Sequence, residues 1–338
     1  MQTRGFLALV LATAVVVIAA GFALSRGDRY VTPAAQGELA APNLAARLGE
    51  LAWLRLERGP MKLDFSEIGG RWVVVGKGNY PANAARMRQL LLGLAELTLV
   101  EAKTRRPELY ARLDLDDPKN GKATEVVVQD RQGRVVGDLI VGKRRPDRLG
   151  SHEDGVYVRR AGEAQTWLTR GAVDVTGNEA GWLDRGILDI PAARIRSMVF
   201  VGEGGVLVIG RAKAGDKFAV DNAPADAKFK SDEAIAGPAG ALSGLELDDV
   251  KPAAQQKPPE SGVASAAYTT FDGLTVTLKL FERDGGDWLT VAASGAGKAA
   301  EEAKAINERV QRWSYAIPAY KAKPLRTRLA DLIAPAKG

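Results

Sequence analysis

The chain of 338 residues contains no cysteine and only one histidine, His152. The absence of cysteine excludes thiol catalysis, disulfide bonds and cysteine-based zinc sites. With one histidine, any His-containing triad or metal site would depend on that single residue. We therefore expect a protein that is not an enzyme and holds neither a metal nor a cofactor.

Charge of one sign is in small excess, and most of that excess lies at one end of the chain. The net charge is +6, and from Lys298 onward nine Lys and Arg residues stand against four Asp and Glu. Hydrophobic residues make up 46% and charged residues 26%, which is typical of a globular protein. Nucleic-acid binding needs basic residues spread over a reading face, so we expect no nucleic-acid partner.

Near the amino terminus, residues 5–24 form the longest run without a charge. About twenty apolar residues at about 1.5 Å rise each would cross a hydrocarbon core of about 30 Å. The run predicts a membrane anchor in residues 1–25, with the bulk of the chain outside the cytoplasm. The alternative is a cleaved signal, for which Ala23 and Ser25 supply small residues.

After a predicted spacer at residues 26–50, alternating polar and apolar residues at 53–57, 62–66 and 71–75 predict an antiparallel meander. A helix is then expected with Asn83 as its N-cap. Its buried stripe is formed by Met87, Leu90, Leu91 and Leu94.

A similar order recurs later in the chain. Alternating segments at 195–201 and 206–209 precede a polar, weakly helical stretch at 225–242, and Trp313 is matched with Trp182. The predicted fold class is α+β: an N-terminal transmembrane helix followed by two tandem, diverged repeats of an antiparallel-sheet-plus-helix unit. The repeats span 51–193 and 194–333, with a loop at 251–267 in the second.

Three clusters contain the residue types of a catalytic triad, a calcium loop or a phosphate-binding loop. Each is explained better as an ordinary turn or solvated loop than as a functional site. Residues 151–154 hold serine, histidine and acids consecutively, whereas a working triad draws them from separate elements. Residues 114–121 miss the calcium-loop pattern because Pro118 and Lys119 occupy a ligand position and the glycine position. Residues 202–205 lack the following helix that a phosphate cradle needs.

Two basic segments are candidates for binding. Lys143, Arg144, Arg145 and Arg148 form a cluster suited to a carboxylate, phosphate or headgroup, although a solvated loop is the favoured interpretation. In the C-terminal tail, aromatic and basic residues alternate in a way that suits a membrane interface or an acidic partner. This candidate interaction set comprises Trp313, Tyr315, Tyr320, Lys321, Lys323, Arg326 and Arg328. The alternative is that Trp313 fills the core.

Five segments carry a resemblance to a known family: LAWLRLERG, GGRWVVV, YPANAARMRQLLLGLAELTL, GWLDRGILDIPAARI and NERVQRWSYAIPAYKAKPL. Over residues 45–333 the chain resembles the domain-of-unknown-function 4340 family. The resemblance implies a bacterial protein, single-pass in the inner membrane with its bulk in the periplasm, in a family partly encoded beside gliding-type ABC transporter components. Many relatives carry Asp where this chain has Asn83. The family brings no established catalytic residue.

The expected function is therefore that of a non-catalytic, membrane-anchored envelope protein. It would act as an accessory or scaffold of a membrane assembly, with an ABC-type transport system or other envelope proteins as partners. The alternative is a binding module that holds a glycan, lipid or peptide in the groove between the repeats. A hydrolase lacks a recognisable nucleophile–base pair.

Overall fold

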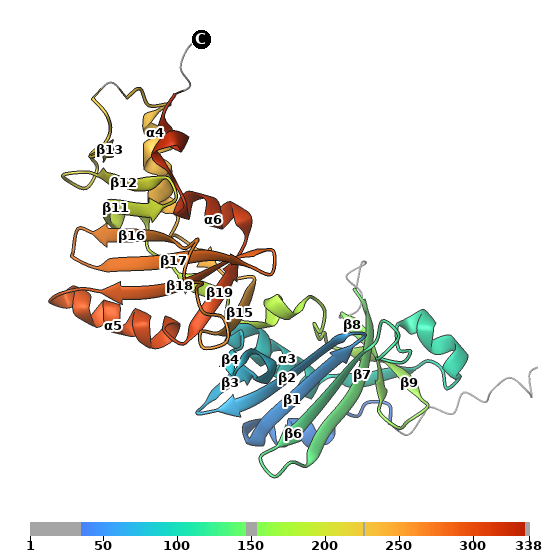
Figure 1. The fold of residues 1–338 in the computed structure, drawn as a ribbon. Helices are drawn as coiled ribbons and strands as arrows, with labels where there is room; N and C mark the ends of the chain where they lie inside the picture. Colours follow the sequence, from blue (N-terminus) through green and yellow to red (C-terminus); the bar gives the residue numbers. More distant parts are fainter. Residues whose placement is uncertain (1–34, 147–153, 226, 335–338) are drawn as a thin grey trace, which may run out of the picture.

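Two large antiparallel sheets dominate the computed structural model, which describes residues 35–146, 154–225 and 227–334 (Figure 1). The first sheet has nine strands in the order β4-β3-β2-β1-β6-β7-β8-β9-β5. Its strands are β1 (Leu51–Arg58), β2 (Met61–Ile68), β3 (Arg71–Val74), β4 (Tyr80–Pro81), β5 (Thr98–Ala102), β6 (Thr124–Asp130), β7 (Val135–Arg145), β8 (Gly155–Arg160) and β9 (Thr166–Arg170).

The second sheet has eight strands in the order β13-β12-β11-β16-β17-β18-β19-β15. These are β11 (Ile195–Gly202), β12 (Gly205–Gly210), β13 (Ala219–Val220), β15 (Asp249–Pro252), β16 (Ala264–Thr270), β17 (Thr275–Arg283), β18 (Gly286–Ser294) and β19 (Trp313–Ile317). A small two-stranded sheet pairs β10 (Gly186–Leu188) with β14 (Leu245–Glu246). Alternation of buried and half-buried residues, as along β6, reflects the two-residue period of a strand.

The two large sheets share one strand order. In the first sheet β1 is followed by β6, β7, β8 and β9, and in the second sheet β11 is followed by β16, β17, β18 and β19. The last position in each order is taken by a strand from earlier in the sequence, β5 in the first sheet and β15 in the second. In this alignment β9 corresponds to β19, so the counterpart of Trp313 is Trp167. Each of these tryptophans lies opposite the last residue of its edge strand, Pro252 and Ala102 respectively. The expected match of Trp313 with Trp182, which lies in a 3-10 turn, was wrong.

Helices are short and few beside the strands. The described α-helices are α2 (Pro42–Ala45), α3 (Ala84–Glu96), α4 (Asp232–Ala236), α5 (Lys298–Val310), α6 (Ala319–Leu325) and α7 (Leu329–Leu332). The 3-10 turns are η1 (Leu48–Glu50), η2 (Val75–Lys77), η3 (Pro107–Leu113), η4 (Glu179–Trp182), η5 (Ala192–Arg194) and η6 (Gly237–Gly240). The start of α3 is as predicted: Asn83 caps it, accepting a hydrogen bond from the Arg86 amide at 3.0 Å.

The predicted α+β class needs correction, because the described chain is mostly antiparallel β-sheet. The stretch expected to replace the first helix in the second half shows why. Ser231 caps α4 there, but α4 ends after five residues and continues only as η6, which contains Pro238 between glycines. Glycine and proline both disfavour helix propagation, so no long helix forms in this stretch.

The predictions of an N-terminal transmembrane helix, a signal-anchor and a single-pass inner-membrane location are also corrected. Among the helices of residues 35–146, 154–225 and 227–334, none combines the length and apolar character needed to cross a membrane. Residues 5–24, on which these predictions rested, lie outside the described residues.

We call each large sheet with its helices a unit. The segment before β1 belongs to the first unit, at least from residue 35, although a spacer was predicted at residues 26–50. Ala40 donates its amide to Leu97 and Leu99 donates to Glu38, so this segment runs beside the edge strand β5. Leu44, in α2, is 1% exposed. Covering the β5 edge removes unpaired backbone groups that would otherwise be open to another chain.

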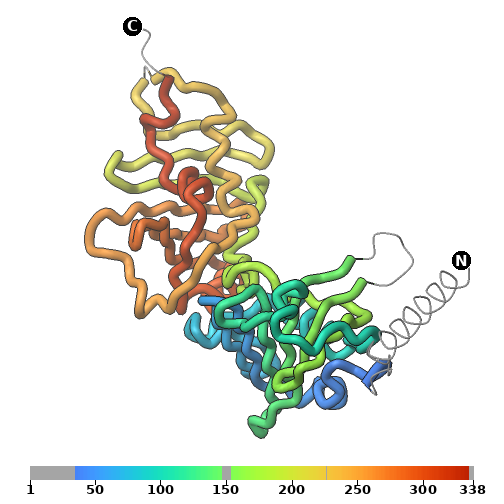
Figure 2. The backbone as a smooth tube through the Cα atoms, turned by 90° about the vertical axis from the view of Figure 1, so that its right-hand side faces the viewer, coloured from blue at the N-terminus to red at the C-terminus, as the bar shows by residue number. Residues whose placement is uncertain are grey.

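The two units touch along one side of each (Figure 2). Side chains of η2 and β4 in the first unit and of β15 and β19 in the second fill this junction. The ring of Tyr80 packs edge-on against Trp313, with ring centroids 5.0 Å apart. Lys77 binds Asp249 across the same contact, with Nζ and Oδ1 2.7 Å apart. Gly78 has φ of 69°, and a Cβ there would lie 2.6 Å from Cγ of Pro252. The predicted groove between the repeats is therefore closed where the units touch.

Candidate functional site

The seven candidate residues of the tail do not form one surface. Trp313 and Tyr315 are 7% and 1% exposed, and both rings contact Tyr80 of the first unit. They fill the junction between the units, whereas the alternative interpretation placed Trp313 in the core of the second unit. Burial raises the pKa of Tyr315 well above its usual value. These two side chains are therefore not available to a partner.

Tyr320 and Lys321 lie at the start of α6. Tyr320 is 73% exposed, the highest exposure among the large hydrophobic residues described. Lys321 donates to the carbonyl of Gly244 at 3.0 Å, and its Nζ lies 5.9 Å from the Tyr320 ring centroid. This pair belongs to the outer surface of α6.

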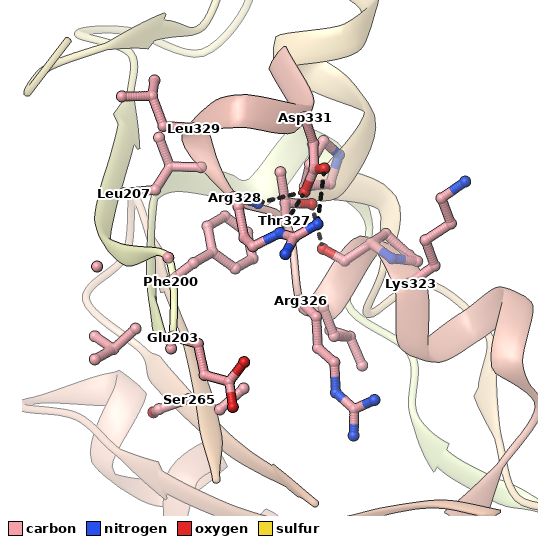
Figure 3. A pocket seen from close by; sticks show the side chains of 18 of the residues that line it. Phe200, Glu203, Leu207, Ser265, Lys323, Arg326, Thr327, Arg328, Leu329 and Asp331 are labelled. Atoms are coloured by element: carbon pink, nitrogen blue, oxygen red, sulfur yellow. Dashed lines mark hydrogen bonds and ion pairs between the residues drawn. The ribbon is translucent and has the colours of Figure 1, made fainter. Parts of the chain in front are cut away.

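The remaining three tail residues, Lys323, Arg326 and Arg328, line one cleft in the second unit. We call it the C-terminal cleft; its volume is about 1300 Å³. One wall is the β11–β12 hairpin with the start of β16, and the other is the tail from α6 to α7 (Figure 3). The loop at residues 259–263 and the segment from α4 to η6 complete the lining.

Local hydrogen bonds hold the tail in place as a wall. At the start of α7, Asp331 accepts from the Arg328 backbone amide at 2.9 Å, as in a capping box. Lys230 donates its Nζ to the carbonyl of Asp331 at 2.8 Å. The hydroxyl of Thr327 donates to the Pro324 carbonyl at the end of α6. The cleft therefore has a fixed wall although the tail contains only short helices.

The floor of the cleft is apolar. Val263, Pro324 and Leu329 line it and are partly exposed, so they can contact a ligand. Phe200, Leu207, Leu325 and Leu332 also line it but are at most 3% exposed, so they support this surface from within. The Phe200 ring packs edge-on against Tyr268, with centroids 5.9 Å apart. An apolar floor with a polar rim is the usual form of a site for an organic or peptide ligand.

Ion pairs at the rim neutralise much of the tail's charge. Arg326 lies 2.5 Å from Asp287 and 3.2 Å from Glu282. Arg328 bonds Asp331 (Figure 3). Burial by itself raises the pKa of Asp331, but hydrogen bonds from Arg328 outweigh it and bring the pKa below its usual value. Lys323 is exposed, and no hydrogen bond or ion pair engages its side chain within the part of the chain that the structure describes; its backbone carbonyl accepts from the Arg326 amide.

The other predicted clusters take the following positions. Residues 202–205 form the hairpin turn between β11 and β12, and this turn borders the cleft. In the segment 114–121, Asp116 accepts from the amides of Lys122 and Ala123, and Asp117 accepts from Lys119. Within the described residues, no group of three or more acidic or histidine side chains could hold a metal ion. Residues 151–153 and Arg148 lie outside the described residues.

Sequence reasoning found three of the cleft residues and missed the facing wall. Phe200, Leu207, Glu203 and Lys230 come from segments more than 80 residues before the tail, and no local pattern connects them to it. The only local signal was the glycine-rich turn at 202–205, which we interpreted as a β-turn alone.

Comparison with known proteins gives a family but no characterised relative. The family model described as "Domain of unknown function (DUF4340)" matches residues 72–265, which is more than half of the chain; the matched range runs from β3 in the first sheet to the start of β16 in the second. Comparisons with curated proteins and with solved structures each gave no match. The chain therefore belongs to the DUF4340 family of proteins that contain this domain of unknown function.

Proposed function

We propose that the chain is a non-catalytic scaffold protein that binds an extended segment of a partner protein in the C-terminal cleft. The observation that carries this proposal is the cleft itself: about 1300 Å³, with an apolar floor and a rim of both charge signs. Mixed charges around apolar pockets suit a peptide, whose backbone and side chains supply both kinds of contact.

The state of the polar groups supports binding rather than catalysis. Arg326 and Arg328 are paired with carboxylates, and the Thr327 hydroxyl donates to a backbone carbonyl. A nucleophile would instead need a base within hydrogen-bond reach. The partner implied by the family resemblance, an ABC-type transport system or another envelope protein, is part of this proposal.

The absence of cysteine makes a site-specific test direct. A Ser261→Cys variant places one thiol at the exposed rim of the cleft, and a photo-crosslinker attached there should capture the partner segment. The matched control is Ser243→Cys, which is exposed in the same unit but does not line the cleft. Peptide mapping of the crosslinked product then identifies the bound segment.

Three further changes separate specific capture from chance contact. Lys323→Glu and Glu203→Lys alter the rim charges, and Ala264→Trp fills the cleft beside Gly202. Each should reduce crosslinking from position 261, because each removes a contact or the space that the segment needs. Equal products from positions 261 and 243, or no effect of Ala264→Trp, would contradict the proposal.

A further inference from the structure

A second surface, in the first unit and apart from the C-terminal cleft, brings two basic segments together. Residues 105–112 contain most of η3 (Pro107–Leu113), and residues 143–145 are the end of β7. Lys143 donates its Nζ to the Arg112 carbonyl at 2.5 Å, which joins the two segments directly. We call residues 105–112 and 143–145 the η3–β7 patch.

A glycine in a strand bulge makes this contact possible. The pairing of β7 with β8 shifts between Val141 and Arg144, and Gly142 lies in the shift. A Cβ at Gly142 would lie only 2.2 Å from the carbonyl oxygen of Leu113. Any larger residue would push η3 away, so glycine at this position lets the two segments meet.

The patch is positively charged and largely uncompensated. It contains six cations and one carboxylate, Glu108, and all seven side chains belong to exposed residues. The cations are Arg105, Arg106, Arg112, Lys143, Arg144 and Arg145. Arg144 pairs with Asp154, with a nitrogen–oxygen distance of 3.0 Å. Within the described residues, no hydrogen bond or ion pair engages the guanidinium groups of Arg105, Arg106, Arg112 and Arg145.

The aromatic rings of the patch are covered by cations of the same chain. The Arg159 guanidinium lies over Tyr110 at 4.8 Å, and Lys143 lies over Tyr157 at 5.9 Å. Tyr110 is only 8% exposed, and its hydroxyl donates to the Ala164 carbonyl. Proteins that bind single-stranded nucleic acid instead offer open aromatic faces to the bases, so this surface does not suit that ligand.

An inserted membrane contact is equally disfavoured. Stable binding at a lipid surface adds apolar side chains to basic ones. The large hydrophobic residues that are exposed in the described chain, such as Ile68, Val135 and Val201, belong to other segments. The exposed side chains of the patch are charged rather than large and apolar. Arg105 and Arg106 precede η3 and Arg112 lies near its end; η3 is a turn of seven residues, about 14 Å long at the 3-10 rise of about 2 Å per residue.

We propose that the η3–β7 patch docks an acidic segment of a partner protein. Arginine guanidinium groups pair with carboxylates in a bidentate manner, and their distribution over the two ends of η3 and the end of β7 suits several carboxylates of one segment rather than a single small anion. Attraction of this kind mainly accelerates association and weakens as salt screens the charges.

The test uses the full chain and a fluorescent oligoglutamate peptide, with fluorescence anisotropy as the readout. The variant R105Q/R106Q/R112Q/R145Q should weaken binding by at least about tenfold, because tenfold corresponds to about 1.4 kcal/mol and four exposed charge pairs together contribute that much or more. The control K62Q/R71Q/R196Q/K279Q removes four exposed cations outside the patch and should change affinity less than about twofold, because screening limits distant charges. Added salt should weaken the wild-type complex.

Two further measurements decide the outcome. Glu108→Gln removes the carboxylate within the patch and should tighten binding, which keeps the proposal testable if the quadruple variant misfolds. Oligothymidine of matched charge and vesicles containing phosphatidylserine are compared on the same variants. Unchanged peptide binding by the quadruple variant, or patch-dependent binding of DNA or vesicles that exceeds peptide binding, would overturn the proposal.

Discussion

The junction between the two units depends on one side chain that can be altered in two steps. Tyr80 belongs to the first unit and is 5% exposed. Its hydroxyl donates to the Asp184 carbonyl at 2.9 Å. Its ring packs edge-on against Trp313 and Tyr315 of the second unit, with ring centroids 5.0 and 6.3 Å apart. The hydroxyl and the ring therefore make separable contributions to the free energy of unfolding.

The contacts set the expected magnitudes. Tyr80→Phe removes one hydrogen bond and should lower the free energy of unfolding by about 1 kcal/mol. Tyr80→Ala also removes the ring from a packed core, which costs about 3–5 kcal/mol, and each of the two edge-on ring pairs accounts for about 0.5–1.5 kcal/mol within that sum. The larger loss should also weaken the coupling between units, so that one unfolding transition separates into two.

Urea unfolding followed by tryptophan fluorescence and circular dichroism measures both effects. The matched control is Phe65→Ala, because Phe65 is fully buried in the first unit and packs on Trp182 with centroids 5.6 Å apart. It should destabilise that unit without touching the junction contact between Tyr80 and Trp313. A loss below about 1.5 kcal/mol for Tyr80→Ala, or equal losses for the Phe and Ala variants, would refute the reasoning.

Three other predictions concern single contacts. Arg194 binds Glu302 and Asp272, each at 2.7 Å, and its hydrogen bonds to Glu302 keep the pKa of that carboxyl below its usual value. This network therefore stabilises the fold above about pH 4.3, the pKa of an unfolded glutamate, and its contribution is lost as pH falls through the lower folded pKa. Arg194→Gln should cost about 1 kcal/mol at neutral pH after solvent screening, and its difference from wild type should vanish in acid unfolding titrations; a constant difference would contradict this. Asn83→Ala removes the cap of α3 and should lower the free energy of urea unfolding by about 1 kcal/mol, with Asn83→Ser as the control that restores it. Gly142→Ala should cost about 1–3 kcal/mol because its Cβ meets the Leu113 carbonyl, and Gly133→Ala, where no atom lies within 4 Å of the added Cβ but φ is 75°, reports the cost of backbone strain alone.

The sequence predicted those elements whose pattern is local. The period of two along β1, β2 and β6 is visible without any knowledge of the partner strand, because one face of each strand is buried. The same holds for α3, where a cap residue precedes an apolar stripe. Elements of this kind carry their own boundary signals.

Helix α5 was missed because its buried face is chemically weak. Its buried residues are Ala299, Ala303, Ile306 and Val310, so two of the four positions contribute only a methyl group. The spacing is helical, but alanine is also common in loops and gives little contrast with the polar side. The helix is fixed instead by tertiary contacts, including the Asn307 side chain, which accepts from the Ala293 amide and donates to its carbonyl.

The placement of charge is a further property that the sequence order conceals. The excess in the C-terminal tail drew attention to Arg326 and Arg328, yet both meet carboxylates, and the partner of Arg326 at 2.5 Å is Asp287, on a distant strand. The cations of the η3–β7 patch come from two separate segments; residues 143–145 stood out as a basic cluster in the sequence, but nothing local connected them to residues 105–112. Packing of the tail against β18 neutralises Arg326, the cap of α7 neutralises Arg328, and the docking of η3 against β7 concentrates the cations of the patch. At moderate salt the field of an exposed charge acts over about 10 Å. An acidic segment is therefore attracted by the cations that lie close together in space, whether or not they are close together in the sequence.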